Sequence, residues 1–388
     1  MAHVLLGWEL GANRGHALRL YLMGKALREA GHQVTFAIQR IDGLSEAEAG
    51  GSPVWQAPLT PRLLISGAMV GGVTVGMADI LGRLGFDDRA IVATMINGWH
   101  HMLAAIRPDI VLGEYAPFLM LASRGRLPTM SIGTAFSQPP STMPQLPSLI
   151  DGPGAIDQAA LLGLINCELA RVGTAPMQSV AQVFEADVMI ADSFAEFDPY
   201  AAHRAIKLAS PLPSGFDARA GAGEEVFVYA PERMALDSAL WRGLAASGLP
   251  IRVHPYRAHP ALVEALVGYG FAVEPNPIPW TKIAERSRMV VSHGGHGFIC
   301  SALAAGLPQV VFHFDLEKIL HGLAVARHGL GGHVALANLN PERFGADLAV
   351  LYRDEALTDR ARAKAVDLAS RDQPDPIAEV IAGVQSLA

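Results

Sequence analysis

Short apolar runs alternate with helix-like segments along the chain, and this alternation constrains the fold more than any other feature. In the first half, the runs expected to form buried strands are residues 3–8, 34–38, 109–113 and 129–132. The alternation restarts after the middle of the chain, with strand-like runs at residues 226–229, 251–253, 289–292 and 309–312. Because strands that alternate with helices form parallel, doubly wound sheets, the sequence predicts an α/β protein with two Rossmann-like domains.

The length of the chain agrees with this division. A chain of 388 residues exceeds the size that one hydrophobic core usually serves, and its 51% hydrophobic and 17% charged side chains exclude a disordered protein. A turn-rich segment, 211–225, is the predicted linker. We therefore expect an N-terminal domain at 1–210 and a C-terminal domain at 226–365, followed by a terminal helix at 366–388 that could return to the first domain.

Charge and hydropathy narrow the classes of partner. The chain has 30 basic and 37 acidic residues, a net charge of −7 and no Lys/Arg run, which argues against nucleic-acid binding. The uncharged stretch 63–78 is shorter than the ~20 residues that span a bilayer, so we expect a buried or interfacial helix and leave peripheral membrane contact open. The long irregular segment 136–157 is a candidate substrate-facing loop.

Two further features predict the compartment. Cys167 and Cys300 lie in apolar surroundings without metal-ligand spacing, and we expect two buried free thiols. The first residues lack the basic region and the small-residue cleavage site of a signal peptide. The sequence therefore predicts a cytoplasmic protein.

A glycine-rich turn joins a predicted strand to an alanine-rich helix in residues 292–311. It contains Gly294, Gly295 and Gly297. The N–H groups at a helix start lack partners within the helix, and glycines let a phosphate approach the backbone, so this turn is a candidate anion site. His293 could donate a further hydrogen bond to a phosphate oxygen. The alternative is a tight turn with a purely structural role.

The same segment resembles the donor-binding signature HGGxGTxxEALxxGxP of the UDP-glycosyltransferase-like bacterial families (UGT/MGT type) with the GT-B fold. The resemblance implies two Rossmann-like domains that face each other across a cleft, the first binding an acceptor and the second a nucleotide sugar. It also implies that His293 and the three glycines hold the donor diphosphate. Phe298 stands where the pattern has Thr or Ser, and Ser301 stands where a Glu usually holds the ribose.

The resemblance extends to three further donor-site positions. Glu317 and Lys318 follow Pro308 by nine and ten residues, where the family has an acidic residue and a Gln that bind sugar hydroxyls. A carboxylate can bind two adjacent hydroxyls, and Lys could serve an oxygen-rich sugar. An exposed surface ion pair is the alternative. Ile278 would contact the base through its backbone, and the implied donor is a UDP-sugar.

The N-terminal residues resemble the pattern GHxxPxxxLAxxLxxxGHxV of these families. The resemblance implies that His16 is the catalytic base, on the loop after the first strand, and Gly15 is counted with the donor-binding residues. A neutral imidazole, with an ordinary pKa of about 6.5, can accept a hydroxyl proton. Arg19 replaces the pattern's Pro, which we interpret as having no effect on the chemistry. Glu114 stands where the family places an Asp, at the end of a predicted strand, and is the expected partner of His16.

These observations together predict an inverting glycosyltransferase that moves a sugar from a nucleotide-diphosphate donor to a hydroxyl of a small-molecule or lipid acceptor. The resemblance implies a metal-independent enzyme with no cofactor besides the donor. A non-catalytic relative that binds a nucleotide sugar or a partner stays open because of the departures from the pattern, as does a sugar-nucleotide epimerase. A nicotinamide-dependent oxidoreductase is disfavoured, because neither half contains GxGxxG with an acidic residue about twenty positions on.

Overall fold

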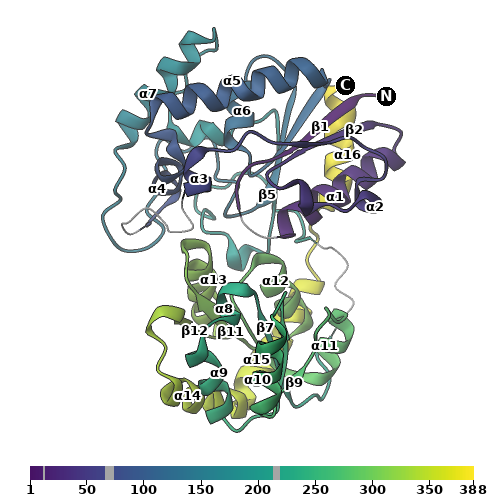
Figure 1. Cartoon of the computed structure of the whole chain (residues 1–388), viewed down its shortest axis with the longest axis vertical. Coiled ribbons are helices and arrows are strands. Elements are labelled where there is room, and N and C mark those ends of the chain that lie inside the picture. The colour runs from purple at the N-terminus through teal and green to yellow at the C-terminus, as the bar shows by residue number, and fades with distance from the viewer. Residues whose placement is uncertain (12–13, 66–73, 213–218) are drawn as a thin grey trace. The chain divides into compact units, whose positions relative to one another are not determined.

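The structure, a computed structural model, describes residues 1–11, 14–65, 74–212 and 219–388 and divides into two compact units (Figure 1). The first unit comprises Met1–Leu212 and Gln373–Ala388, and the second comprises Pro213–Asp372. Parts of the expected 63–78 helix and of the expected linker, residues 66–73 and 213–218, lie outside the described residues.

The first unit contains a parallel six-stranded sheet in the order β3-β2-β1-β4-β5-β6. Its strands are β1 (His3–Trp8), β2 (Gln33–Ile38), β3 (Val54–Gln56), β4 (Ile110–Glu114), β5 (Thr129–Thr134) and β6 (Val188–Asp192). This is the strand order of a Rossmann fold. The chain adds β2 and β3 on one side of β1 and then returns to add β4, β5 and β6 on the other side, so the order reverses between β1 and β4. Ligands of such sheets bind at the carboxyl ends of the strands beside this reversal.

Helices cover both faces of this sheet because alternate residues of its strands point to opposite sides. Leu6 and Trp8 of β1 belong to a core that includes Leu20 of α1 (Arg14–Glu29) and Val384 of α16 (Pro376–Leu387). The helices α1 and α16 pack against each other (Figure 1). Gly7 faces the other side, where a Cβ would lie 2.1 Å from Leu119 Cδ2 of α6 (Pro117–Ser123). The other helices of this unit are α2 (Glu46–Ala49), α3 (Pro61–Ile65), α4 (Met77–Leu81), α5 (Arg89–Ile106) and α7 (Gln158–Arg171).

The second unit repeats the same strand order in a parallel sheet, β12-β11-β10-β7-β8-β9. Its strands are β7 (Glu225–Ala230), β8 (Ile251–Pro255), β9 (Ala272–Val273), β10 (Ser287–Ser292), β11 (Gln309–His313) and β12 (Gly331–Ala335). Counted from β7, the order again reverses between the first and fourth strands, β7 and β10. The predicted α/β class with two Rossmann-like domains is confirmed.

The second sheet is also covered on both faces. Val228 of β7 packs in a core with Leu240 of α9 (Ser238–Ala246) and Phe344 of α14 (Pro341–Arg353). Phe227 faces the opposite side, toward a core that includes Ala302 of α12 (His296–Ala305). The remaining helices are α8 (Glu232–Ala235), α10 (Pro260–Gly268), α11 (Trp280–Arg286), α13 (Leu316–Arg327) and α15 (Glu355–Ala369).

Aspartates fix where many of these helices begin. Their side chains accept hydrogen bonds from the free N–H groups of the first turn, which a helix leaves without internal partners. The capping residues are Asp88 of α5, Asp157 of α7, Asp237 of α9, Asp315 of α13, Asp354 of α15 and Asp375 of α16. Asn340 caps α14 in the same way, and the C-terminal residues form three separate helices, α14 to α16.

Several details differ from the expectations. Helix α1 begins at Arg14, so His16 lies in its first turn and not on a loop. Cys300 is buried but Cys167 is exposed, because it lies on the outer side of α7. The second unit extends to Asp372, because α15 continues past residue 365 and packs on α12. Residues 136–157 form neither helix nor extended strand. Among the described residues, no helix has the length and hydropathy needed to cross a membrane.

Glu9 joins the end of β1 to the start of α6. Its carboxylate accepts hydrogen bonds from the backbone N–H groups of Phe118 (2.9 Å) and Leu119 (2.7 Å) and from the indole N–H of Trp99. Burial raises the pKa of Glu9 to about 8, although all three donors favour the ionised form. The folded protein therefore holds a proton that the unfolded chain releases near pH 4.5.

This difference predicts that the protein loses stability as the pH rises from about 5 to about 8, and that the loss levels off above the folded-state pKa of about 8. A Glu9→Gln variant keeps an acceptor oxygen and cannot ionise, so its stability should vary less over this range. We expect the difference in slope to be worth at least about 1.4 kcal/mol, the value of a one-unit pKa shift. Urea unfolding of the unchanged protein and of Glu9→Gln at about pH 5 and about pH 8 measures this difference in the free energy of unfolding. Equal changes of the free energy of unfolding with pH in both proteins would contradict the assignment.

Candidate active site

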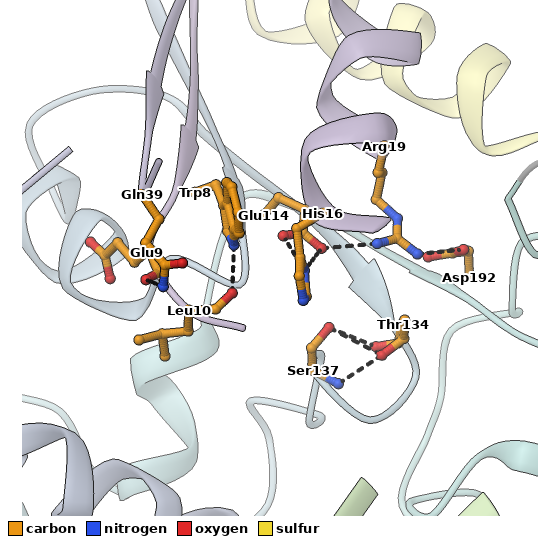
Figure 2. Close-up of polar contacts among 10 residues, drawn as sticks. All are labelled: Trp8, Glu9, Leu10, His16, Arg19, Gln39, Glu114, Thr134, Ser137 and Asp192. Carbon is orange, nitrogen blue, oxygen red and sulfur yellow. Dashed lines mark hydrogen bonds and ion pairs between the residues drawn. The ribbon is translucent and has the colours of Figure 1, made fainter. Parts of the chain in front are cut away.

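His16 and Glu114 meet at the carboxyl edge of the first sheet. The Nδ1 atom of His16 lies 2.8 Å from Oε2 and 2.9 Å from Oε1 of Glu114 (Figure 2). Because a carboxylate accepts the hydrogen bond, the proton of the neutral imidazole is on Nδ1 and Nε2 has a free lone pair. Glu114 is fully buried, whereas the His16 side chain is 20% exposed. The geometry is that of a general base held by a carboxylate.

Aromatic rings hold the plane of the His16 imidazole. Trp8 stacks on it with a centroid distance of 5.5 Å, and Tyr115 stacks at 6.2 Å. Tyr115 follows Glu114 directly and has a positive φ of 45°, a strained conformation of the kind found at functional sites. Gly11 has a φ of 94°, and a Cβ on it would lie 2.0 Å from His16 Nε2. The glycine therefore leaves the space that the reactive nitrogen occupies.

Arg19 extends this pair into a chain of buried charges. Its Nη1 donates to Glu114 Oε1 at 2.9 Å, and its Nη2 donates to Asp192 Oδ2 at 3.0 Å (Figure 2). Asp192 ends β6 and also accepts the backbone N–H of Leu212 at 3.1 Å. Burial raises the pKa of the Asp192 carboxyl, and the Arg19 guanidinium opposes this effect. Arg19 was interpreted as having no effect on the chemistry, and the structure shows that it contacts Glu114, the expected partner of His16.

Sequence reasoning missed Asp192, although a weak signal was present. It ends an apolar strand, Val188–Asp192, at the same edge of the sheet as Glu114. Acidic residues at the carboxyl ends of parallel strands are candidates for functional sites. The pairing with Arg19 joins residues 173 positions apart, which no local pattern reveals.

The glycine-rich turn of the second unit lies where β10 meets α12. Gly295 is the N-cap of α12 and offers no side chain to its first N–H groups. Gly294 has a φ of 76°, and a Cβ on it would lie 2.6 Å from Val311 Cγ1. Its carbonyl accepts a hydrogen bond from His321 Nδ1 at 2.7 Å. This turn therefore requires glycine, and the ten-residue helix begins without a side-chain cap, as helix starts that bind anions do.

His293 lies beside this helix start and is 5% exposed. Burial, together with the Lys318 ammonium group, lowers the pKa of His293 to about 3, so the ring is neutral at physiological pH. Its Nδ1 atom has no hydrogen-bond partner among the residues that the structure describes. A buried polar atom of this kind needs a partner from outside the chain, and a phosphate oxygen fits when Nδ1 carries the proton.

Two other expected donor-site residues, Phe298 and Ile278, pack among aromatic side chains, and Ser301 lies one turn after Phe298 on α12. Phe298 stacks with Tyr229 at a centroid distance of 5.3 Å and contacts the tilted ring of Trp280 at 4.8 Å, and Ile278 packs in the same cluster. The Ser301 hydroxyl donates to the carbonyl of Gly297, in its own helix, at 2.8 Å. Ser301 therefore uses its hydroxyl within α12, unlike the Glu that stands at this place in the family pattern.

Glu317 and Lys318 lie in the first turn of α13 and contact each other directly. The Lys318 ammonium group is also 3.7 Å from Asp315 Oδ2. The two side chains are only 19% and 11% exposed, so they are not the exposed surface pair considered as an alternative. Burial disfavours the charged form of Glu317, but the Lys318 ammonium group outweighs this effect and holds the pKa of the Glu317 carboxyl well below its usual range. The pair is ionised, and both charges act on His293, whose pKa the Lys318 ammonium group lowers and the Glu317 carboxylate raises.

The described residues contain no group of three or more His, Cys, Asp or Glu side chains that could hold a metal ion. The expected metal-independent mechanism stays a prediction.

The buried charges predict a large stability effect at Arg19. An Arg19→Met variant leaves Glu114 and Asp192 without their shared cation and should lose about 3–5 kcal/mol of unfolding free energy. The matched control is Arg40→Met, which removes an exposed pair with Asp42 and should cost at most about 1 kcal/mol. Denaturant unfolding of both variants tests the difference, and equal losses would contradict the role of the buried pairs.

Comparison with known proteins supports the assignment of the fold. Residues 274–384 match the family described as erythromycin biosynthesis protein CIII-like, C-terminal domain. The chain is also similar to the elloramycin glycosyltransferase ElmGT of Streptomyces olivaceus, with 33% identity over 104 residues. This match spans about a quarter of each protein, 26% of this chain and 26% of the relative.

Solved structures resemble the chain over its whole length. The calicheamicin glycosyltransferase CalG4 aligns with a TM-score of 0.70 and 19% identity, covering 100% of this chain and 99% of its own. The glycosyltransferase SsfS6 of Streptomyces sp. SF2575, complexed with thymidine diphosphate, aligns with a TM-score of 0.61 and 16% identity, covering 99% and 100%. At these identities the likeness shows the fold alone. The resemblance found in the sequence is thus confirmed: the chain has the GT-B fold of the glycosyltransferases, and its C-terminal part matches the erythromycin CIII-like family.

Proposed function

We propose that this protein is an inverting glycosyltransferase that moves a sugar from a nucleoside diphosphate to an acceptor hydroxyl, with His16 as the general base. The observation that carries the proposal is the hydrogen bond from His16 Nδ1 to the buried Glu114 carboxylate. It directs the basic Nε2 away from the carboxylate at the edge of the sheet where ligands of this fold bind (Figure 2).

The proposed reaction is a single displacement. Nε2 of His16 accepts the proton of the acceptor hydroxyl as its oxygen attacks the anomeric carbon. The bond from that carbon to the diphosphate breaks at the same time, and its electron pair leaves on the diphosphate oxygen. Attack from the face opposite the leaving group inverts the anomeric configuration. The Glu114 carboxylate and the π-faces of Trp8 and Tyr115 stabilise the imidazolium that forms.

The second unit would bind the leaving diphosphate. The open N–H groups at the start of α12 supply positive partial charge, and neutral His293 supplies a hydrogen bond. The buried Glu317 and Lys318 are available to bind hydroxyl groups of the sugar. These fixed dipoles stabilise the growing negative charge without a metal ion, which supports the expectation that the donor is the only co-substrate.

The donor nucleoside can be specified further. The family pattern holds a ribose with a Glu, whereas Ser301 here donates its hydroxyl to Gly297. A nucleoside without a 2′-hydroxyl needs no such partner. One structure of this fold, SsfS6, contains thymidine diphosphate. We therefore propose a thymidine diphosphate sugar in preference to the UDP-sugar that the sequence pattern implied.

The acceptor is proposed to be a small molecule with an apolar body. Rings of Trp8 and Tyr115 flank the His16 imidazole, and the Tyr115 hydroxyl lies 3.6 Å from the Met77 sulfur. An apolar aglycone would contact these surfaces while its hydroxyl approaches Nε2. A lipid acceptor has the same chemistry, and a screen of both kinds with a common donor distinguishes them.

Replacing the base tests the reaction directly. A His16→Ala variant should lose about 10²- to 10⁴-fold in kcat, the usual contribution of a general base, and should bind thymidine diphosphate as tightly as the unchanged protein. Calorimetry measures the binding, and mass spectrometry measures transfer with a panel of acceptors. The control is His101→Ala, which removes an exposed imidazole from α5. Full activity of His16→Ala would refute the assignment of the base.

The same panel separates catalysis from binding alone. If the unchanged protein binds nucleoside diphosphates but neither transfers the sugar nor hydrolyses a donor, the chain is a non-catalytic relative that binds nucleotide sugars. If it binds none, the diphosphate site itself is wrong.

Substitutions at Ser301 test the nucleoside preference. A Ser301→Ala variant should bind thymidine diphosphate within about twofold of the unchanged protein, because the hydroxyl is engaged by the Gly297 carbonyl of its own helix. A Ser301→Glu variant should shift the ratio of affinities toward uridine diphosphate by about tenfold, the value of one charged hydrogen bond to the 2′-hydroxyl. Calorimetric titration with both nucleotides measures the ratio. A strong preference of the unchanged protein for uridine diphosphate would contradict the proposal.

A further inference from the structure

The chain of charges behind His16 contains two residues to which the reaction has assigned no role. His16 and Arg19 are three residues apart on α1 and therefore lie on one helix face. Both donate to Glu114 at the end of β4, and Arg19 donates also to Asp192 at the end of β6. The Arg19 side chain is 7% exposed, and both carboxylates are fully buried. These charges interact with little screening by water.

The signs of these charges alternate along the chain of contacts. Arg19 is the cation between the carboxyl groups of Glu114 and Asp192, its charge opposes the effect of burial on the pKa of the Asp192 carboxyl, and His16 ends the row. A lone buried carboxylate would favour the protonated imidazole strongly, and a protonated ring cannot accept a proton. The Arg19 guanidinium reduces the negative potential that Glu114 exerts on His16. Asp192 partly cancels the guanidinium and restores some of that potential.

We propose that Arg19 and Asp192 are positioning residues that set the pH range in which His16 is the neutral base. Arg19 shifts the titration of His16 toward lower pH, and Asp192 shifts it back toward higher pH. The guanidinium also fixes the rotation of the Glu114 carboxylate, because it bonds Oε1 while Oε2 points at His16 Nδ1. The role in catalysis rests on the proposed function, whereas the effect on titration does not.

The other groups that face the imidazole do not produce this pattern. Trp8 and Tyr115 stack on the ring from β1 and from the end of β4, and neither carries a charge near neutral pH. Glu114 is the one carboxylate that a described contact brings to the ring. The opposite effects of Arg19 and Asp192 are therefore a specific signature, since general damage to the fold would not move the titration in two directions.

The test measures the titration of His16 in the intact protein by NMR, following its imidazole C–H signal and assigning it with His16→Ala. An Asp192→Asn variant keeps the shape of the side chain and should lower the titration midpoint by about one pH unit, as expected for one charge at this range in a protein interior. An Arg19→Met variant should raise the midpoint by a similar amount. Arg19→Lys keeps the charge and should leave the midpoint within about 0.3 units.

The outcomes decide the proposal separately from the proposed function. Midpoints of Asp192→Asn and of the unchanged protein that agree within about 0.2 units, or that differ in the opposite direction, would overturn it. If Arg19→Met does not fold, the Asp192→Asn result decides alone, because Arg19 keeps Glu114 as its partner in that variant. In the active enzyme, the acid limb of the pH profile of kcat/KM should move with the midpoint. Midpoints that move in a protein without transfer activity would reject the proposed function and support the electrostatic role.

Discussion

The chemistry of the first unit depends on one buried carboxylate, that of Glu114. A carboxylate without solvent contact is costly unless donors satisfy it and a cation balances it. Here both requirements are met from one face of α1, by the His16 ring and the Arg19 guanidinium. The same contacts therefore hold the helix against the sheet and orient the imidazole of His16, the proposed base. Any change at Glu114 alters the stability and the proton chemistry together.

The two units use one strand order for two different tasks. In each sheet the winding reverses beside a central pair of strands, β1 with β4 and β7 with β10, and the polar groups gather where those strands end. The first unit holds titratable side chains there, which the proposed general base needs because it must gain and lose a proton. The second unit holds the start of α12 and a histidine that burial keeps neutral, which suit the fixed positive potential of the proposed diphosphate site. The two units thus differ in the residues that stand at the carboxyl ends of equivalent strands and not in the strand order itself.

The sequence predicted the features that depend on neighbouring residues. The strands and the glycine turn at Gly294 follow from local patterns that need no knowledge of the tertiary fold, whereas the donor-side role of His293 came from a resemblance and stays a prediction. Glu114 could be predicted as the partner of His16 because it ends a predicted strand where the family pattern has an Asp. The link from Arg19 to Asp192 was not predictable, because it depends on which strands become neighbours and which side chains are long enough to meet. The hydrogen bond from the Ser301 hydroxyl to Gly297 was missed for a different reason. The family pattern describes only the Glu that usually stands at this position, and it says nothing of what a Ser does there.

The departures from the family pattern in the first unit belong to one set. A Glu replaces the usual Asp at position 114, and an Arg replaces the usual Pro at position 19. With Pro at position 19, the second oxygen of a buried carboxylate would lack its cationic donor. With Arg at position 19 and no Asp192, the Nη2 group of the buried guanidinium would lose its anionic acceptor. Each residue removes an unpaired charge that another would create, so the three should change together and not one at a time. A residue that departs from a family motif, as Arg19 does, can therefore have its charged partners at other positions of the same site.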